Sequence, residues 1–274
     1  MPRITRVIAA LGAASVVLAL AACTPASEVS TSYITEGKLT IATGQPAYPP
    51  YVVENEPESG EGFEAAIAYA VAEQLGFAKD DVVWVRTGFE EVIQPGPQNF
   101  DINLQQFTIS DERKAAVDFT SPYYATPQAV VTLEGTAAAD ADSIADLSGL
   151  LIGAASGTTS FTAIEDVIKP TQGAQVFNTN DELKVALQNG TVDAIVVDLP
   201  TAFFLTGVEL DGGVLVGQLP QDAGTSDEWG ILLAKDSPLT AEVTAAVDAL
   251  RADGTLDAIA DEWLGADAGA PVLN

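Results

Sequence analysis

Apolar and polar positions along this chain follow two periods, and together they predict alternating strands and helices. Short runs rich in β-branched residues predict strands at 39–43, 82–86, 102–104, 128–133, 150–154, 175–177, 192–197, 214–218 and 230–234. Apolar residues spaced three and four apart predict helices at 62–76, 161–168, 181–189, 238–253 and 255–264, with short helices after Phe89 and around Arg113. This alternation predicts an α/β fold in which helices cover the sheets.

The organisation along the chain fits two compact parts. A polar stretch rich in Ala and Asp at 135–143 looks like a boundary between them, and the strand at 214–218 would return the chain to the first part. In sheets of this kind, ligands sit beyond the carboxyl ends of the strands. Arg113, the 157–159 loop and Asp198 all follow predicted strands, so we expect them at one site.

The N-terminal residues resemble an export signal with a lipid-attachment site. Arg3 and Arg6 precede an apolar stretch, Val7–Leu20, that is short for a membrane span, and small residues lead directly to Cys23. This pattern resembles the bacterial lipobox, so we expect residues 1–22 to be a lipoprotein signal peptide and Cys23 to carry a diacylglyceryl group. Residues 23–36 would then form a polar tether on the outer side of the cell membrane. The alternative is a secretory signal in which this cysteine is incidental.

Composition narrows the possible functions. Without Arg3 and Arg6 the chain carries nine Lys and Arg against 39 Asp and Glu, a net charge of about −30 that repels nucleic acid. The chain has no histidine and one cysteine, which argues against Ser-His-Asp and Cys-His catalysis and against a transition-metal site. It also lacks the Gly-rich phosphate-binding motifs. We therefore expect no nucleic acid partner, no metal and no cofactor.

The segment 101–123 contains the strongest candidate for binding chemistry. It reads as a buried strand, a polar turn and a short helix that begins at Ser110 as N-cap and carries Arg113 in its first turn. A helix N-terminus, a guanidinium and the Thr108 hydroxyl together suit a carboxylate. The alternative is that Arg113 pairs with Asp111, Glu112 or Asp118 on a solvated surface.

Motifs in a fixed order extend along nearly all of the chain after the tether. They are Tyr48-Pro49-Pro50-Tyr51, Gly62-Phe63-Glu64, Phe100-Asp101-Ile102, the run 108–113, Val117-Asp118-Phe119, Ser121-Pro122-Tyr123, Gly157-Thr158-Thr159, Asn189-Gly190, Asp193-Ala194, Asp198, Asp253-Gly254-Thr255-Leu256 and Trp263-Leu264-Gly265. With these motifs, Lys38 to Gly265 resembles family 3 of the bacterial extracellular solute-binding proteins, the amino-acid-binding subunits of ABC importers.

This resemblance implies a type II periplasmic-binding-protein-like clamp. Each lobe would be a sheet flanked by helices, and two crossover strands, near 129–133 and 215–218, would form the hinge. The first lobe would be discontinuous, residues 37–128 with 219–266, the second would span 129–218, and 267–274 would be a C-terminal tail. The ligand would be a polar amino acid or a related small zwitterion, passed to the permease and ATPase subunits of the importer.

The resemblance also implies roles for individual residues. Arg113 would pair with the ligand α-carboxylate, helped by the Thr108 hydroxyl and the backbone N–H of Thr159. Asp198 would hold the α-ammonium. Tyr48 and Phe89 would flank the ligand side chain, and Gln106 would narrow the pocket or bind a polar side chain.

Each role has a simpler alternative. Asp198 precedes Leu-Pro and could be a helix N-cap. The 157–159 segment could be only a turn, and Tyr48, Phe89 and Trp229 could be core aromatics. Gly44 stands where cationic-amino-acid binders of this family often have Asp, which disfavours a pocket for Lys or Arg. Ala155 is also shorter than usual.

Two other functions are compatible with the same clamp. An enzyme of dehydratase or lytic type would need a general acid or base in the cleft. Asp198 is the carboxylate that we can place there, and it would stay ionised opposite a bound ammonium, so we expect a binding protein and not an enzyme. A sensory module without a transport role would use the same binding chemistry.

Overall fold

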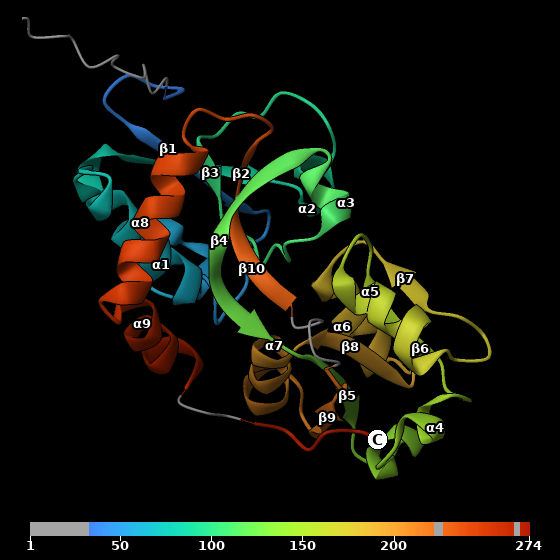
Figure 1. Cartoon of the computed structure of the whole chain (residues 1–274). Coiled ribbons are helices and arrows are strands. Elements are labelled where there is room, and N and C mark those ends of the chain that lie inside the picture. The colour runs from blue at the N-terminus through green and yellow to red at the C-terminus, as the bar shows by residue number, and fades with distance from the viewer. Residues whose placement is uncertain (1–32, 222–226, 266–268) are drawn as a thin grey trace, which may run out of the picture. The chain divides into compact units, whose positions relative to one another are not determined.

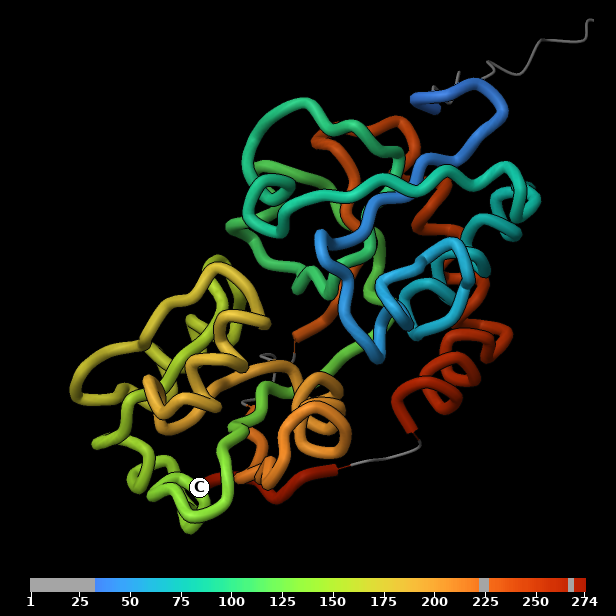
Figure 2. The backbone as a smooth tube through the Cα atoms, turned by 180° about the vertical axis from the view of Figure 1, so that it is seen from behind, coloured from blue at the N-terminus to red at the C-terminus, as the bar shows by residue number. Residues whose placement is uncertain are grey.

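The computed structural model describes residues 33–221, 227–265 and 269–274, all within one compact unit, Thr31–Asn274. Cys23 and the expected signal peptide lie outside the described residues. The unit contains two five-stranded sheets flanked by helices, and the two lobes are named after these sheets (Figures 1 and 2). No helix in the described ranges is both long and apolar enough to cross a membrane.

The sheet of the first lobe has the strand order β2-β1-β3-β10-β4. Its strands are β1 (Leu39–Gly44), β2 (Val82–Thr87), β3 (Ile102–Asn103), β4 (Val117–Thr126) and β10 (Asp227–Ala234). Strand β1 is parallel to β2 and β3, whereas β10 is antiparallel to β3 and β4.

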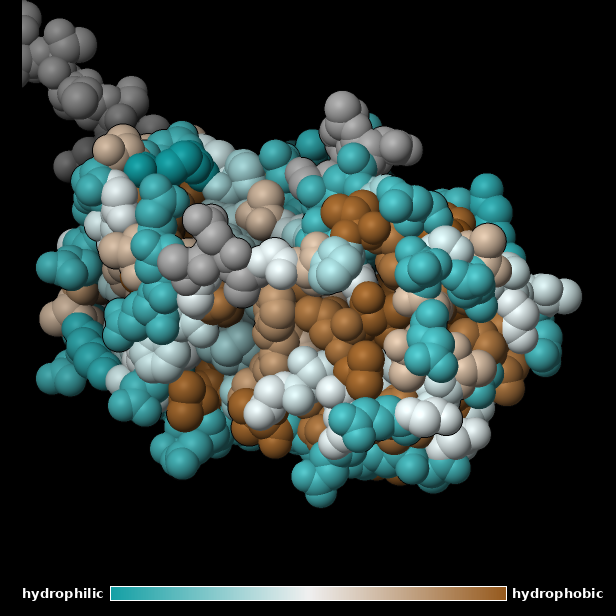
Figure 3. All heavy atoms as spheres, turned by 90° about the horizontal axis from the view of Figure 1, so that it is seen from below, coloured by the Kyte–Doolittle hydropathy of each residue, from teal (hydrophilic) through white to brown (hydrophobic). Residues whose placement is uncertain are grey.

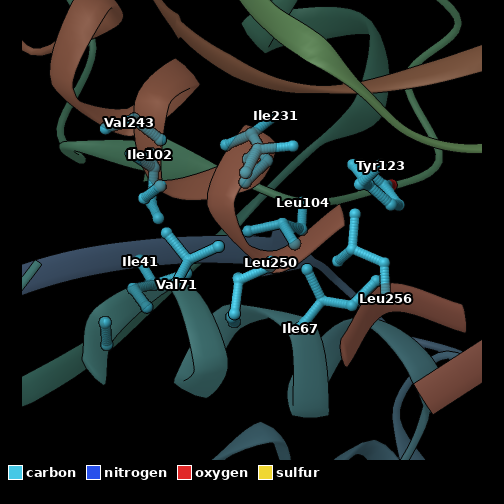
Figure 4. Packing of buried hydrophobic residues seen from close by; sticks show 14 of the residues in the cluster. Ile41, Ile67, Val71, Ile102, Leu104, Tyr123, Ile231, Val243, Leu250 and Leu256 are labelled. Carbon is cyan, nitrogen blue, oxygen red and sulfur yellow. The ribbon is translucent and has the colours of Figure 1, made fainter. Parts of the chain in front are cut away.

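Helices cover both faces of this sheet because successive residues of a strand point to opposite sides. Ile41 packs in the larger core with the helices α1 (Phe63–Gln74), α8 (Thr240–Ala252) and α9 (Thr255–Leu264), as Figure 4 shows. The next residue, Ala42, belongs to a second cluster on the side of the short helix α2 (Phe89–Val92). The short helix α3 (Asp111–Lys114) leads into β4.

The sheet of the second lobe has the order β7-β6-β8-β5-β9. Its strands are β5 (Gln128–Leu133), β6 (Ile152–Ala155), β7 (Gln175–Phe177), β8 (Ala194–Asp198) and β9 (Gly213–Gln218). One face packs against α6 (Asn180–Gln188) and α7 (Leu199–Phe204), and the other against α4 (Ile144–Leu147) and the segment after α5 (Thr159–Ala163). Single helical turns and π-helical segments lie at η1 (Val53–Asn55), η2 (Pro57–Ser59), η3 (Lys79–Asp81), η4 (Ala137–Asp140), η5 (Ile164–Ile168) and η6 (Leu205–Glu209).

The chain passes from the first sheet to the second between β4 and β5, at residues 126–128, and returns between β9 and β10. Strands β5 and β9 pair with each other, and so do β4 and β10, so the two passages connect neighbouring strands of one sheet with neighbouring strands of the other. The expected boundary at 135–143 is wrong, because this stretch connects β5 with β6 of the same sheet. Its Ala- and Asp-rich composition reflects a surface connection and not a change of lobe.

Strand β4 was not predicted from the sequence. Its ten residues include Pro122, which cannot donate a hydrogen bond to a neighbouring strand. The structure accommodates this proline because β4 is an edge strand, paired among the described strands with β10 alone, and the pairing is irregular around Gly230.

The C-terminal residues lie on the second lobe. The Gln218 N–H donates to the Pro271 carbonyl at 2.8 Å, and the Leu273 N–H donates to the Gln218 carbonyl at 2.9 Å. Leu273 is 1% exposed and belongs to the core beneath α4. Its neighbour Val272 is about half exposed, as is Val185. The hydrogen bonds and the burial of Leu273 show that the chain reaches the second lobe again after α9.

Figure 3 shows one face of the molecule, on which apolar side chains gather between hydrophilic ones.

Candidate ligand-binding cleft

A cavity of about 280 Å³ lies between the two lobes. The carboxyl ends of β1, β6 and β8 all reach it, as expected for sheets of this type. Its volume is near the lower limit of ligand pockets, which span roughly 300–1,000 Å³, so it suits a small molecule. The lining includes Tyr48, Tyr51, Phe89, Gln106 and Arg113 from the first lobe and Ser156, Thr159, Asp198 and Thr201 from the second.

Arg113 is buried in the wall of this cavity. Ser110 caps α3 by accepting from the Arg113 backbone N–H at 3.2 Å, which confirms the predicted cap. The guanidinium donates to the carbonyls of Thr108 at 2.8 Å and Gly157 at 2.9 Å, and it lies 5.4 Å from the centre of the Phe89 ring. Arg113 therefore connects the two lobes.

The surface ion pair that we considered for Arg113 is not formed. Within the described ranges no carboxylate lies within 4.0 Å of the guanidinium. Asp111 pairs instead with Lys114, and Asp118 pairs with Lys235. Burial lowers the pKa of Arg113, and the more distant Asp227 and Asp198 carboxylates oppose this effect. Burying a cation without an adjacent anion is costly, so we expect the Arg113 guanidinium to bind an anionic group of a ligand.

Asp198 stands at the N-cap position of α7, but its side chain makes no capping hydrogen bond. Its carboxylate instead accepts from Gln128 Nε2 at 2.6 Å. Burial and then the Asp227 charge raise the pKa of Asp198 to about 7, while Gln128 and Arg113 act in the opposite direction. Asp198 therefore occupies the N-cap position, as the alternative predicted, but its side chain does not cap the helix. The carboxylate lines the cavity instead.

The 157–159 segment is both a turn and part of the cavity wall. Thr158 caps α5 by accepting from the Phe161 N–H at 3.3 Å. Thr159 is the first residue of α5, where backbone N–H groups lack an acceptor within the helix. The hydroxyls of Thr159 and Thr108 lie 3.4 Å apart. Thr108 itself does not line the cavity, and it contacts Arg113 through its carbonyl.

The aromatic side chains divide into two groups. Tyr48 and Phe89 are half-buried and line the cavity, which argues against a purely core role. Phe89 stacks on Phe107 with ring centres 5.0 Å apart. Trp229 is 0% exposed and packs in the larger core, so its role is packing.

Two positions shape the wall near the first lobe. Gln106 has a positive φ of 50°, and both its backbone N–H and its side-chain amide donate to the Glu64 carboxylate. At Gly44 an added Cβ would lie 2.8 Å from the Pro46 carbonyl oxygen and 3.0 Å from Gln105 Nε2. An aspartate at position 44 would therefore require these neighbours to move.

Further contacts join the lobes around the cavity. The hydroxyls of Tyr51 and Thr201 are 2.8 Å apart, and the Tyr48 hydroxyl donates to Asp181 at 3.4 Å. The Ser156 hydroxyl donates to the Glu90 carboxylate. The lobes thus meet on several sides of the cavity, as in the closed state of a clamp.

Three polar residues near the cleft were missed by sequence reasoning. Glu64 accepts from Tyr123 and Gln106, and burial raises its pKa to about 7. Its signals were its place in the Gly62-Phe63-Glu64 motif and an acidic side chain in the first turn of a mostly apolar helix. Gln128 starts an apolar strand, and Asp227 starts β10. Their importance comes from tertiary contacts, which no local pattern reveals. In the described ranges, no group of three or more His, Cys, Asp or Glu side chains could hold a metal ion.

Comparison with known proteins agrees with this geometry. The model of the bacterial extracellular solute-binding proteins, family 3, matches residues 39–266. An L-arginine-binding protein of Pseudomonas aeruginosa is 34% identical over 81% of this chain and 86% of its own length. An L-cystine-binding protein of Escherichia coli is 31% identical over 80% of each.

Solved structures give the same result. An ancestral arginine-binding protein bound to glutamine superimposes with a TM-score of 0.70 at 29% identity, covering 85% of this chain and 100% of that one. The two-lobed α/β fold is thus the type II periplasmic-binding-protein fold, as the resemblance implied. The chain belongs to family 3 of the bacterial extracellular solute-binding proteins.

Proposed function

We propose that this protein is the substrate-binding subunit of an ABC importer and captures a polar amino acid, or a related small zwitterion, between its lobes. The observation that carries the proposal is the pair Arg113 and Asp198. Arg113 is buried and Asp198 is half-buried, the two belong to different lobes, and both line the same small cavity. A guanidinium and a carboxylate placed in this way match the two ends of an α-amino acid.

The energetics support a zwitterionic ligand. Removing two charges from water is costly unless the site supplies opposite charges for both. Only closed lobes bring Arg113 and Asp198 to the same cavity, so binding and closure are linked. Hydrogen bonds to charged groups contribute roughly 1.5–3 kcal/mol each. A micromolar Kd needs about 8 kcal/mol, which a few such bonds and the Phe89 contact provide.

The proposal names the class of polar amino acids and not one particular side chain. The two relatives described above are an arginine-binding and a cystine-binding protein, and these two ligands differ in size and charge. The cavity lining contains several uncharged amides, Gln45, Gln105, Gln106, Asn178 and Asn180, together with the carboxylates Glu90 and Glu91. We therefore place the ligand among polar amino acids without choosing one.

An enzymatic role has one observation in its favour. The pKa of Asp198 is raised to about 7, a value suited to a general acid or base. The ammonium of an amino-acid ligand would lower it again and keep the carboxylate ionised. Incubating the protein with its ligand, followed by mass spectrometry, separates the two roles: a binding protein returns the ligand unchanged.

A thermal-shift screen tests the proposed function. The protein lacking residues 1–22 is heated with single amino acids and small zwitterions. A true ligand at a hundredfold excess over Kd stabilises the fold by about 2.7 kcal/mol. The shift should disappear in Arg113→Ala and Asp198→Asn, and remain in Arg251→Ala, an exposed arginine paired with Asp248. The proposal fails if no zwitterion stabilises the protein, or if both cleft variants respond like the unaltered protein.

A further inference from the structure

Gln128 makes hydrogen bonds with three side chains at the point where the chain crosses between the lobes. It is the first residue of β5 and is 7% exposed. Its Nε2 donates to Asp198 at 2.6 Å and to Asp227 at 2.5 Å, and its Oε1 accepts from the Ser160 hydroxyl at 2.6 Å. Both amide hydrogens are used, and the two carboxylate acceptors identify this end of the amide as the nitrogen, because a serine hydroxyl could bond either end.

These partners come from both lobes. Asp198 ends β8 and Ser160 lies in α5, both in the second lobe, whereas Asp227 begins β10 in the first. Strand pairing places Gln128 opposite Asp198, and Asp227 opposite Thr126, two residues before Gln128. One side chain therefore ties the second-lobe carboxylate of the cavity to a carboxylate of the first lobe.

The two carboxylates accept from the same nitrogen atom, so their charges repel at short range. Burial and the Asp227 charge raise the pKa of Asp198 to about 7, and burial also raises the pKa of Asp227. Other charged or titratable groups face this pair: Arg113 from α3 attracts it, Glu64 from α1 repels it, and the phenols of Tyr51 and Tyr123 lie nearby. The pair thus carries more negative charge than one guanidinium balances.

We propose that Gln128 is a positioning residue that aims Asp198 at the ligand ammonium and joins it with Asp227 into one carboxylate pair, which holds a proton in the empty cleft and releases it when the ammonium binds. The inference rests on the proposed function. The ligand enters as a zwitterion whose amine is already protonated. One carboxyl O–H bond breaks, its proton passes to solvent, and the ammonium takes its place.

The consequence is a ligand affinity that depends on pH. Since the carboxylate must be ionised to receive the ammonium, affinity should rise as pH increases through about 7 and level off above it. Near pH 7 each bound ligand should release a fraction of a proton. That fraction should fall towards zero at pH 8.5, where the pair is already ionised.

Two variants should shift the midpoint of the affinity–pH profile in opposite directions. Gln128→Met keeps the length of the side chain but removes the donor that favours the ionised pair. It should move the midpoint of the affinity profile to higher pH and weaken binding at least tenfold at pH 7, with partial recovery at pH 8.5. Asp227→Asn removes the neighbouring charge, so the midpoint should move to lower pH. Gln188→Met, an exposed glutamine at the end of α6, is the matched control and should leave the profile unchanged.

The measurement is titration calorimetry from pH 5.5 to 8.5 in two buffers with different ionisation enthalpies, using the amino acid found in the thermal-shift screen. Opposite shifts of the midpoint and a buffer-dependent heat near pH 7 support the carboxylate pair. A purely structural role for Gln128 would lower affinity equally at every pH, and that result overturns the inference. If Gln128→Met does not fold, the Asp227→Asn profile and the proton release of the unaltered protein decide.

The outcomes also separate this inference from the proposed function. If no amino acid or zwitterion binds the unaltered protein, the proposed function fails and the inference fails with it. If one binds with an affinity that is constant from pH 5.5 to 8.5 and without proton release, only the carboxylate pair is refuted.

Discussion

Replacing Arg113 by alanine tests the carboxylate end of the cleft. The guanidinium donates to carbonyls of both lobes and stacks on Phe89, so its orientation is fixed before the ligand arrives. Arg113 is buried, so water cannot readily replace it as the partner of the ligand carboxylate when the side chain is removed. Truncating one partner of a buried, hydrogen-bonded charge pair costs roughly 2–5 kcal/mol. At about 1.4 kcal/mol per tenfold change, Kd should rise by roughly 30-fold to several thousandfold.

Arg113→Lys refines this prediction. Lysine keeps the charge but cannot present two parallel donors, so its Kd should lie between those of the unaltered protein and Arg113→Ala. Calorimetry with the ligand from the thermal-shift screen measures all three, with Arg251→Ala as control for loss of an exposed arginine. If Arg113→Ala binds within twofold of the unaltered protein, the ligand carboxylate is bound elsewhere and the reasoning is wrong.

Three further predictions concern other parts of the molecule. The raised pKa of Glu64, about 7, means that the folded state binds its proton more tightly than the unfolded state, so stability rises as pH falls from 7 to about 4.5. Glu64→Gln should remove roughly 3 kcal/mol of this rise in denaturant unfolding, and an unchanged pH dependence would contradict the burial argument. Leu273→Ala should lower the free energy of unfolding by about 2–5 kcal/mol because the side chain is 1% exposed, whereas no change would mean that the C-terminal segment is not docked. Cys23→Ser should move the full chain from the detergent phase to the aqueous phase in Triton X-114 partitioning, and equal partitioning would refute lipidation.

The sequence predicted most elements because their residues have one clear period. The β-branched runs at 128–133 and 175–177 match β5 and β7, and the helix at 255–264 matches α9. Prediction failed where tertiary context decides. Strand β4 tolerates Pro122 only because it is an edge, and the 135–143 stretch lies inside one lobe because of strand pairing.

In the cleft, too, local patterns predicted some features and tertiary contacts decided the others. Local sequence placed Arg113 on a capped helix and Asp198 at the end of a strand, and the structure places both at the cavity. That they belong to opposite lobes of one cleft came from the family resemblance. The contacts of Gln128 with Asp198 and Asp227 join residues up to 99 positions apart, so they could only emerge from the fold.

A crystal structure of the protein with its ligand tests the central claim most directly. The account predicts the ligand carboxylate within hydrogen-bond distance of the Arg113 guanidinium and the Thr159 backbone N–H, and the ammonium on Asp198. A ligand bound in the reverse orientation, or outside the cavity between the lobes, would contradict it.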